Sequence, residues 1–309
     1  MQKIGLLFGS ENNFPEAVIT RINNLGRGKA YAEKIELGAL LSNEYNDHNA
    51  ILDLVSHEVP YYASYLKLAV MNGAKVINNP FIISPFEAFF NVALCDRLNI
   101  KMPRTAILPS KEIPPNTSAS TLSNLEFPLD WEKVFDYVGF PGILKPNKFD
   151  LSHSEITVYN RAEFFSAYDI SGNKPFIFQQ YIEFEKFYRT FIINKKHTLT
   201  LCYDPELPRH QRYIQPAEDI SGKISEKTND SAVKYSEASG LHFIAIDFGL
   251  IDDEIFAIDI HTPPVIIHKE LPNGAYNEIV EITANAMIEL SQQPNEEAKK
   301  HEIASYFNS

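Results

Sequence analysis

The chain has 309 residues, 44% of them hydrophobic and 22% charged, a composition that suits a globular protein of two or three subdomains. The formal net charge of −12 disfavours nucleic-acid binding through a basic face, although a local basic pocket stays open. No apolar run approaches the roughly 20 residues of a membrane span, and the amino terminus predicts a strand rather than a signal peptide, so we expect a cytoplasmic protein.

The first 80 residues predict a small βαβ domain. Three apolar runs indicate strands of a parallel sheet, at residues 3–9, 51–56 and 74–79. Residues 61–73 have helical spacing, and Gly73 is the expected C-cap. The segment SHEVPYY at 56–62 ends a strand where α/β sheets open their crevices, which makes it a candidate acceptor-binding edge. Helix capping with packed tyrosines is the alternative.

Strands dominate the remainder of the chain. A helix is predicted at 84–99, beginning at an N-cap Ser84 that is followed by Pro85. Residues 110–128 indicate a linker or surface loop, and 275–290 a closing helix. The strand-like segments suggest antiparallel sheets and are 140–147, 154–160, 174–182, 187–193, 197–203, 243–248 and 255–260.

The two cysteines, Cys95 and Cys202, lie in apolar surroundings without CxxC spacing. Buried, reduced thiols are the interpretation that this pattern favours over a redox or metal-binding role.

Two acids, Asp247 and Asp259, each interrupt an apolar strand. If the strands are antiparallel neighbours, both carboxylates can point into one cleft, where they would repel each other unless a cation such as Mg²⁺ lies between them. Neutralising either acid should then leave the metal-free protein as stable as before. The alternative is a structural acid that satisfies a turn or caps a backbone group.

Two basic residues also lie in apolar strands. Lys145 ends the run GFPGILKP and is expected to meet an anion, with phosphate as the natural partner. A strand-end lysine that extends to solvent is the alternative. Arg189 interrupts YRTFII and requires an anion that it can bind with two hydrogen bonds. A loop adds Arg209, His210 and Arg212, which on a solvated surface would carry no function.

The order of these segments resembles that of the ATP-grasp superfamily, which includes D-alanine–D-alanine ligase, glutathione synthetase and the ribosomal-protein glutamate ligases. The resemblance covers roughly residues 1–290 and is strongest to uncharacterised bacterial ATP-grasp proteins. The segments that carry it are SHEVPYY (56–62), NNPF (78–81), PLDW (128–131), GFPGILKP (139–146), YDP (203–205) and AIDIHTPP (257–264).

The resemblance implies an α/β and α+β architecture, the ATP-grasp fold with an N-terminal βαβ domain. Its expected divisions are 1–80 for the first domain, 81–295 for the ATP-grasp domain with a lid at about 108–180, and 296–309 for a polar tail. It implies an ATP-dependent ligase that joins a carboxylate to an amine through an acyl-phosphate. Expected partners are small-molecule or peptide substrates, with a homodimer or pairing with an intact relative as further options.

The resemblance also assigns roles to individual residues. Lys145 looks like the lysine that holds the ATP phosphates, and Glu185, with Glu183 as the alternative, is a candidate for the ribose. Arg189 and Arg212 are candidate catalytic residues. Adenine would lie against the hinge residues Gln179, Gln180, Tyr181 and Ile182. Mg²⁺, with Mn²⁺ as the alternative, would be held by Asp247, Asp259 and His261.

The sequence departs from the family pattern at several of these positions. Active members usually carry a phosphate-binding lysine where Ala88 stands here. The phosphate-covering loop, 147–156, has no glycine and is expected to be mobile; its side-chain donors would be Lys148, Ser152, His153 and Ser154. His261 or Thr262 stands where an asparagine is usual, which weakens a site for a hard cation. Three functions therefore stay open: a divergent ligase, a non-catalytic or regulatory protein, and a kinase-like phosphoryl transfer.

Overall fold

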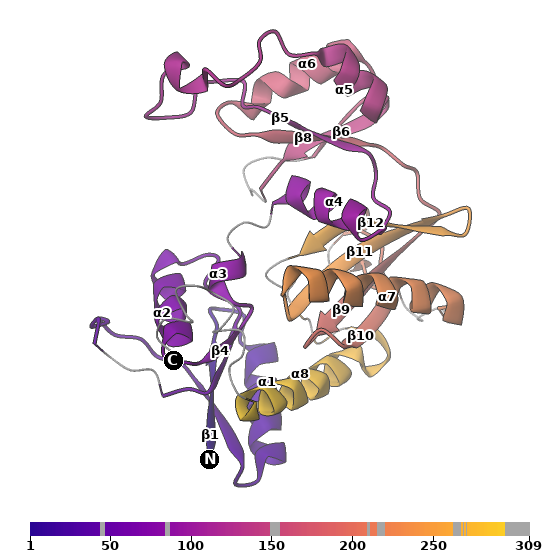
Figure 1. Cartoon of the computed structure of the whole chain (residues 1–309). Coiled ribbons are helices and arrows are strands. Elements are labelled where there is room, and N and C mark those ends of the chain that lie inside the picture. Colours follow the sequence, from indigo (N-terminus) through magenta and orange to yellow (C-terminus); the bar gives the residue numbers. More distant parts are fainter. Residues whose placement is uncertain are drawn as a thin grey trace. The chain divides into compact units, whose positions relative to one another are not determined.

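A computed structural model describes residues 1–43, 47–83, 87–148, 155–208, 211–214, 220–261, 267, 269 and 271–293 (Figure 1). The chain forms two compact units, each assembled from separate segments. Unit 1 comprises Met1–Ser84, Lys186–Asp247 and His261–Ser309, and unit 2 comprises Pro85–Glu185 and Phe248–Ile260. The sequence-based division at residues 80 and 295 stays a prediction.

The first sheet of unit 1 is parallel and has the strand order β2-β1-β3-β4. Its strands are β1 (Gln2–Leu7), β2 (Ala30–Lys34), β3 (Ala50–Asp53) and β4 (Lys75–Ile77). Its helices are α1 (Asn13–Gly26), α2 (Pro60–Met71) and the short α3 (Pro80–Ile83). The predicted strands and the helix near 61–73 are confirmed. The C-cap of this helix is Asn72 rather than the predicted Gly73, which follows it with φ +93°. Helix α1 and strand β2 are not predicted from the sequence.

The second sheet has the order β10-β9-β11-β12, with β9 and β10 antiparallel. Its strands are β9 (Lys186–Ile193), β10 (His197–Cys202), β11 (Phe243–Ile251) and β12 (Glu254–His261). Helix α7 (Gly222–Ser239) packs on β9 and β10. Helix α8 (Ala275–Gln292), preceded by the short 3₁₀ helix Pro272–Gly274, lies beside α1 (Figure 1). Because α8 also contacts β1, β3, β9 and β10, one apolar core joins the parallel sheet to β9 and β10 within unit 1.

Unit 2 is built on an antiparallel sheet with the order β5-β8-β6-β7. Its strands are β5 (Thr105–Leu108), β6 (Gly142–Pro146), β7 (Ile156–Val158) and β8 (Phe176–Gln180). Its helices are α4 (Ala88–Arg97), α5 (Trp131–Val138) and α6 (Arg161–Tyr168), with short 3₁₀ turns at Ala119–Leu122 and Asp169–Ser171. Aromatic side chains from α5, α6 and β8 form its core.

The helix predicted at 84–99 begins later than expected. The structure starts α4 at Ala88 and ends it at Arg97, with the extended residue Glu87 at the N-cap. Ser84 and Pro85, which carried the predicted start signal, lie outside the described residues. The later start has a physical cause, because Asn147 supplies the acceptors for the first N–H groups of the helix.

Both cysteines are buried thiols that form no disulfide, as the sequence predicts. Burial raises the pKa of the Cys95 thiol to about 12, so this thiol stays protonated and unreactive at neutral pH. None of the described helices combines the length and the apolar composition needed to cross a membrane.

Candidate functional site

The candidate phosphate lysine, Lys145, lies on β6 in the sheet of unit 2, opposite Ile177 of β8. Its side chain is only 12% exposed, and its Nζ lies 3.3 Å from Oε1 of Glu155. The Glu155 side chain is 60% exposed, which makes this ion pair weak and replaceable. Lys145 is therefore a partly desolvated cation whose carboxylate partner Glu155 is largely exposed.

The N-terminus of α4 is closed by Asn147, two residues after Lys145. The main-chain oxygen of Asn147 accepts from the N–H of Ala88, and its Oδ1 accepts from the N–H of Phe89, both at 2.9 Å. Its Nδ2 donates to Glu87 at 2.6 Å. Ala88, where the family resemblance predicts a lysine, thus opens a helix whose first N–H groups already have acceptors within the chain.

The side chains at the end of β8 face other strands. Gln179 is 2% exposed and donates to Oγ1 of Thr105 at 2.9 Å. The side-chain oxygen of Gln180 accepts from Nε of Arg104 at 3.2 Å. Both amides are engaged within unit 2, so any nucleotide contact at these two residues would have to use the main chain.

The chain leaves regular strand structure after Gln180. Tyr181, 36% exposed, donates its main-chain N–H to the oxygen of Pro141, and Ile182 is half-buried. Glu185, the candidate ribose ligand, is exposed, and its carboxylate accepts from the N–H of Asp252 at 3.4 Å. This segment is irregular and partly exposed, and its role as the adenine hinge stays a prediction.

In unit 1, the anion that Arg189 requires is Asp247. Nε of Arg189 donates to Oδ1 of Asp247 at 2.6 Å, and Nη2 donates to Oδ2 at 2.7 Å. The two side chains are 6% and 9% exposed. The structure confirms that Arg189 binds an anion through two hydrogen bonds. The sequence does not identify Asp247 as that anion, because 58 residues separate the two.

Three further side chains surround this pair. Nε2 of His261 lies 2.9 Å from Oδ2 of Asp247 and 3.3 Å from Nη2 of Arg189. The ring of Tyr203 lies 3.7 Å from Cζ of Arg189, and the hydroxyl of Tyr213 lies 3.4 Å from Nη1. The guanidinium is thereby held at its edge by a carboxylate and on its face by an aromatic ring.

The charges of the pair are strongly stabilised. Burial acts against ionisation of Asp247, but His261 and Arg189 outweigh it and lower the pKa of Asp247 to about 2. Burial likewise acts to lower the pKa of Arg189, but Asp247 outweighs that effect and raises it. Both groups are therefore ionised at neutral pH.

The second candidate catalytic residue, Arg212, lies in the same unit. It is half-buried, and its Nη1 donates to the hydroxyl of Tyr203 at 3.1 Å, while its Nε donates to the oxygen of Leu207 at 2.9 Å. Tyr203 therefore contacts both arginines, Arg189 through its ring and Arg212 through its hydroxyl. The sequence analysis did not assign a role to Tyr203 or Tyr213, although Tyr203 opens the YDP segment.

The third candidate metal ligand, Asp259, is half-buried on β12 and accepts from the N–H of Ile260 at 2.9 Å. Within the described ranges, no group of three His, Cys, Asp or Glu side chains is arranged to hold a metal ion. Mg²⁺ prefers six oxygen ligands in near-octahedral geometry. The residues around Asp247 do not fit that ion, because a guanidinium and an imidazole occupy its surroundings. The assignment of Mg²⁺ to Asp247, Asp259 and His261 stays a prediction.

The segment 56–62 lies at the carboxyl end of β3. Asp53, 4% exposed, accepts from the N–H groups of Val55 and Ser56 and from the Ser56 hydroxyl. Pro60 is the first residue of α2. These contacts shape the turn between strand and helix, and the role of this edge in acceptor binding stays a prediction.

Several predicted residues lie outside the described part of the chain. They are Ser152, His153 and Ser154 of the phosphate-covering loop, Arg209 and His210 of the basic loop, Thr262, and the tail 296–309. The expected mobility of 147–156 falls largely on these residues and stays a prediction.

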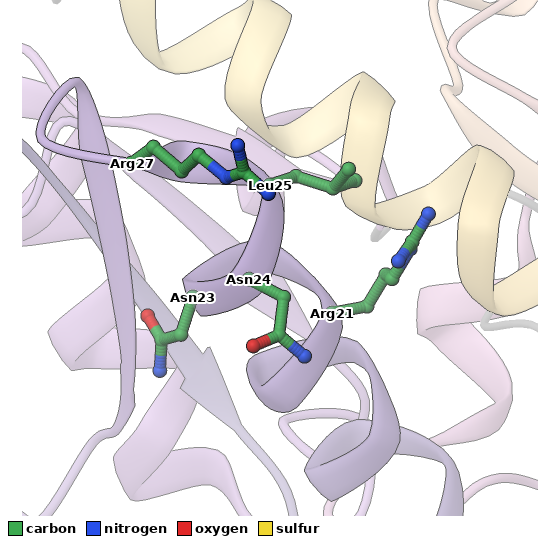
Figure 2. A pocket seen from close by; sticks show the side chains of 5 residues that line it. All are labelled: Arg21, Asn23, Asn24, Leu25 and Arg27. Atoms are coloured by element: carbon green, nitrogen blue, oxygen red, sulfur yellow. The ribbon is translucent and has the colours of Figure 1, made fainter.

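The structure also has a surface hollow at the end of α1 that the sequence did not indicate (Figure 2). Its lining residues are Arg21, Asn23, Asn24, Leu25 and Arg27. Arg21 points toward α8, where it pairs with Glu281, and Asn23 exchanges two hydrogen bonds with the main chain of Ala32. These contacts join structural elements, and the hollow therefore gives no indication of a functional site.

Solved structures share this fold at low sequence identity. An ATP-grasp RimK domain protein from Sphaerobacter thermophilus has a TM-score of 0.64 and 13% identity, over 93% of this chain and 99% of that one. D-alanine–D-alanine ligase from Bacillus anthracis in complex with ATP has a TM-score of 0.61 and 15% identity, over 94% of this chain and 96% of that one. The ATP-grasp ligase PsnB with a minimal precursor, Mg and ADP has a TM-score of 0.61 and 14% identity, over 94% of this chain and 98% of that one.

No family model matches the sequence, and no curated protein is similar to it at the sequence level. The structural similarity extends over nearly the whole chain, so the chain has the ATP-grasp fold.

Proposed function

We propose, from this ATP-grasp fold, that the protein is an ATP-dependent ligase that joins a carboxylate to an amine through an acyl-phosphate. The observation that carries the proposal lies in unit 2. One sheet presents the partly desolvated Lys145 on β6 and the irregular segment Tyr181–Ile182 at the end of the neighbouring β8. The adjacent strands β6 and β8 thus supply a cation for phosphate and a main-chain edge for a planar base.

The proposed reaction has two steps. A carboxylate oxygen of the first substrate attacks the γ-phosphorus of ATP, and the bond to the bridging oxygen breaks to release ADP. The nitrogen of the amine then attacks the acyl carbon, phosphate leaves, and the amine loses a proton. The protein's part is to position the reactants and to offset negative charge.

The residues divide this work by their chemistry. Lys145 would offset the charge of the ATP phosphates, and the main chain of Tyr181 and Ile182 would bind the adenine edge. Glu185, which is exposed beside this segment, would accept from the ribose hydroxyls. Arg212, half-buried and held by the Tyr203 hydroxyl in unit 1, would bind a substrate carboxylate.

A second function is supported by a specific observation. Asn147 already accepts from the first N–H groups of α4, which begins at Ala88, where the family resemblance predicts a lysine. Arg189 already donates to both carboxylate oxygens of Asp247. A protein that binds nucleotide but does not transfer its phosphate would tolerate both features. A kinase-like transfer that ends at the phosphorylated substrate is the remaining option on this fold.

The first test is nucleotide binding by the wild-type chain. We expect millimolar ATP with Mg²⁺ or Mn²⁺ to raise the melting temperature, because a ligand that binds only the native state stabilises it. Lys145→Met keeps the apolar stem and removes the charge, so it should weaken ATP binding at least about tenfold in calorimetric titration, the loss expected for one charged hydrogen bond. Lys133→Ala, an exposed lysine on α5, is the matched control and should bind as wild type does.

Two outcomes would contradict this proposal. If ATP neither binds to the wild-type chain nor raises its melting temperature, the proposed nucleotide site is wrong. A Lys145→Met variant that binds as tightly as Lys133→Ala would show that the lysine has no part in it. ADP release measured with pools of amino acids and dipeptides, with and without hydroxylamine to trap an acyl-phosphate, separates the ligase from the non-catalytic function.

A further inference from the structure

We infer that Asp247 is the structural counter-ion that positions Arg189, and that it is not a metal ligand of this protein. The inference concerns the residue that the family resemblance would assign to Mg²⁺. It bears on the metal requirement of the proposed ATP site, but its central test needs no nucleotide.

The geometry of the carboxylate is the first reason. Both oxygens of Asp247 accept from Arg189, at 2.6 and 2.7 Å, and Oδ2 also lies 2.9 Å from Nε2 of His261. This fork is the strongest geometry that an arginine forms with a carboxylate. A divalent cation on either oxygen would lie within a few ångströms of a guanidinium that cannot lose its proton, and the two would repel each other.

The surroundings of Arg189 are the second reason, because they hold the guanidinium in place. Tyr203 stacks 3.7 Å from its Cζ, and the Tyr213 hydroxyl lies 3.4 Å from Nη1. The two rings lie 5.2 Å apart and belong to residues that pair across an isolated β-bridge. To release Asp247 for a metal, the arginine would have to leave an aromatic face and a buried hydrogen-bonding site together.

The third reason is the chemistry of the neighbour. His261 supplies a nitrogen where a site for Mg²⁺ would supply an oxygen. Because Arg189 can only donate and Asp247 can only accept, Nε2 of His261 completes the pair in either tautomer, as a donor to the carboxylate or as an acceptor from the guanidinium. The histidine therefore fits an ion pair better than it fits a magnesium site.

The inference reverses the sequence-based expectation for one acid. If Asp247 faced only another carboxylate, Asp247→Asn would leave the metal-free protein as stable as wild type or make it more stable. Because Asp247 is the counter-ion of a buried arginine, Asp247→Asn leaves the charge of Arg189 uncompensated. Such a change is among the most destabilising known for buried ion pairs. Asp259→Asn has no such arginine partner among the described contacts and should be mild.

The experiment is thermal melting in EDTA, without nucleotide, for four variants and wild type. We expect Asp247→Asn and Arg189→Met each to lower the melting temperature by roughly 5 to 10 °C. The double variant should lose clearly less than the sum of the two, because it removes both charges. Asp259→Asn should lie within about 2 °C of wild type. Melting of Asp247→Asn at or above the wild-type temperature, or strict additivity in the double variant, would overturn the inference.

A second measurement keeps the inference falsifiable if the single variants fold poorly. The double variant is used at low temperature to titrate Mg²⁺ at fixed ATP. The Mg²⁺ concentration for half-maximal ATP binding should stay within about threefold of wild type, and a rise above about tenfold would show that Asp247 binds the metal. A wild-type chain that binds no ATP would refute the proposed function alone, because the melts in EDTA would still decide the role of Asp247.

Discussion

Replacement of Asn78 by alanine is expected to cost about 3 to 5 kcal/mol of folding free energy. Asn78 is 2% exposed and follows β4. Its Oδ1 accepts from the N–H groups of His242 and Phe243 at 2.8 Å, and its Nδ2 donates to the oxygen of Phe243 at 2.6 Å. Alanine would leave three buried main-chain groups unpaired at the point where β11 begins.

The neighbouring asparagine provides a matched control. Asn79 is 4% exposed, but among the described residues its side chain accepts only from the N–H of Phe81, at 3.0 Å. Asn79→Ala should therefore cost about 1 kcal/mol. Urea unfolding followed by far-ultraviolet circular dichroism gives both values. Equal losses for the two alanine variants would show that the three bonds of Asn78 add nothing to stability.

Asn78 also has a structural role within the NNPF segment of this chain. The segment NNPF (78–81) reads in the sequence only as a landmark before a helix. In the structure Asn78 ties the first sheet of unit 1 to the second, because its partners precede and open β11. A short motif can thus mark a fold through hydrogen bonds to residues more than 160 positions away.

The parts of the fold that sequence reasoning found are those with strong local patterns. Strands β9 and β11 are long apolar runs, and their periodicity and length are sufficient to predict them from the sequence. Helix α1 was missed although Phe14, Val18 and Ile22 lie four residues apart on its buried face. This spacing is the pattern of an amphipathic helix, so the sequence does contain a signal for α1.

The parts of the site that sequence reasoning could not provide depend on long-range pairing. A buried arginine in a strand predicts an anion, and the structure confirms that need for Arg189. Whether the anion is a substrate, a phosphate or Asp247 is decided by the pairing of distant strands, which local pattern does not contain. The same holds for Tyr203, whose neighbour Tyr213 reaches it across a loop.

Truncation of Phe164 to alanine should destabilise unit 2 by about 3 to 5 kcal/mol. Phe164 is fully buried in α6, and its ring lies 4.8 Å from Phe178, 4.9 Å from Phe135 and 5.6 Å from Trp131, centroid to centroid. Alanine would remove a whole ring from a cluster of aromatic side chains that have few ways to collapse onto the space. Trp131 is the single tryptophan of the chain, so its fluorescence reports this core.

The measurement is urea unfolding followed in parallel by Trp131 fluorescence and by circular dichroism. The three longest described helices, α1, α7 and α8, belong to unit 1, so the dichroism signal is dominated by that unit. In Phe164→Ala we expect the fluorescence midpoint to fall well below the dichroism midpoint, and in Asn78→Ala the opposite order. Phe165→Ala is the control, since Phe165 also lies near Trp131, at 5.3 Å, but is 37% exposed and fills less of the core. Equal fluorescence midpoints for Phe164→Ala and Phe165→Ala would mean that burial of Phe164 does not hold this core together.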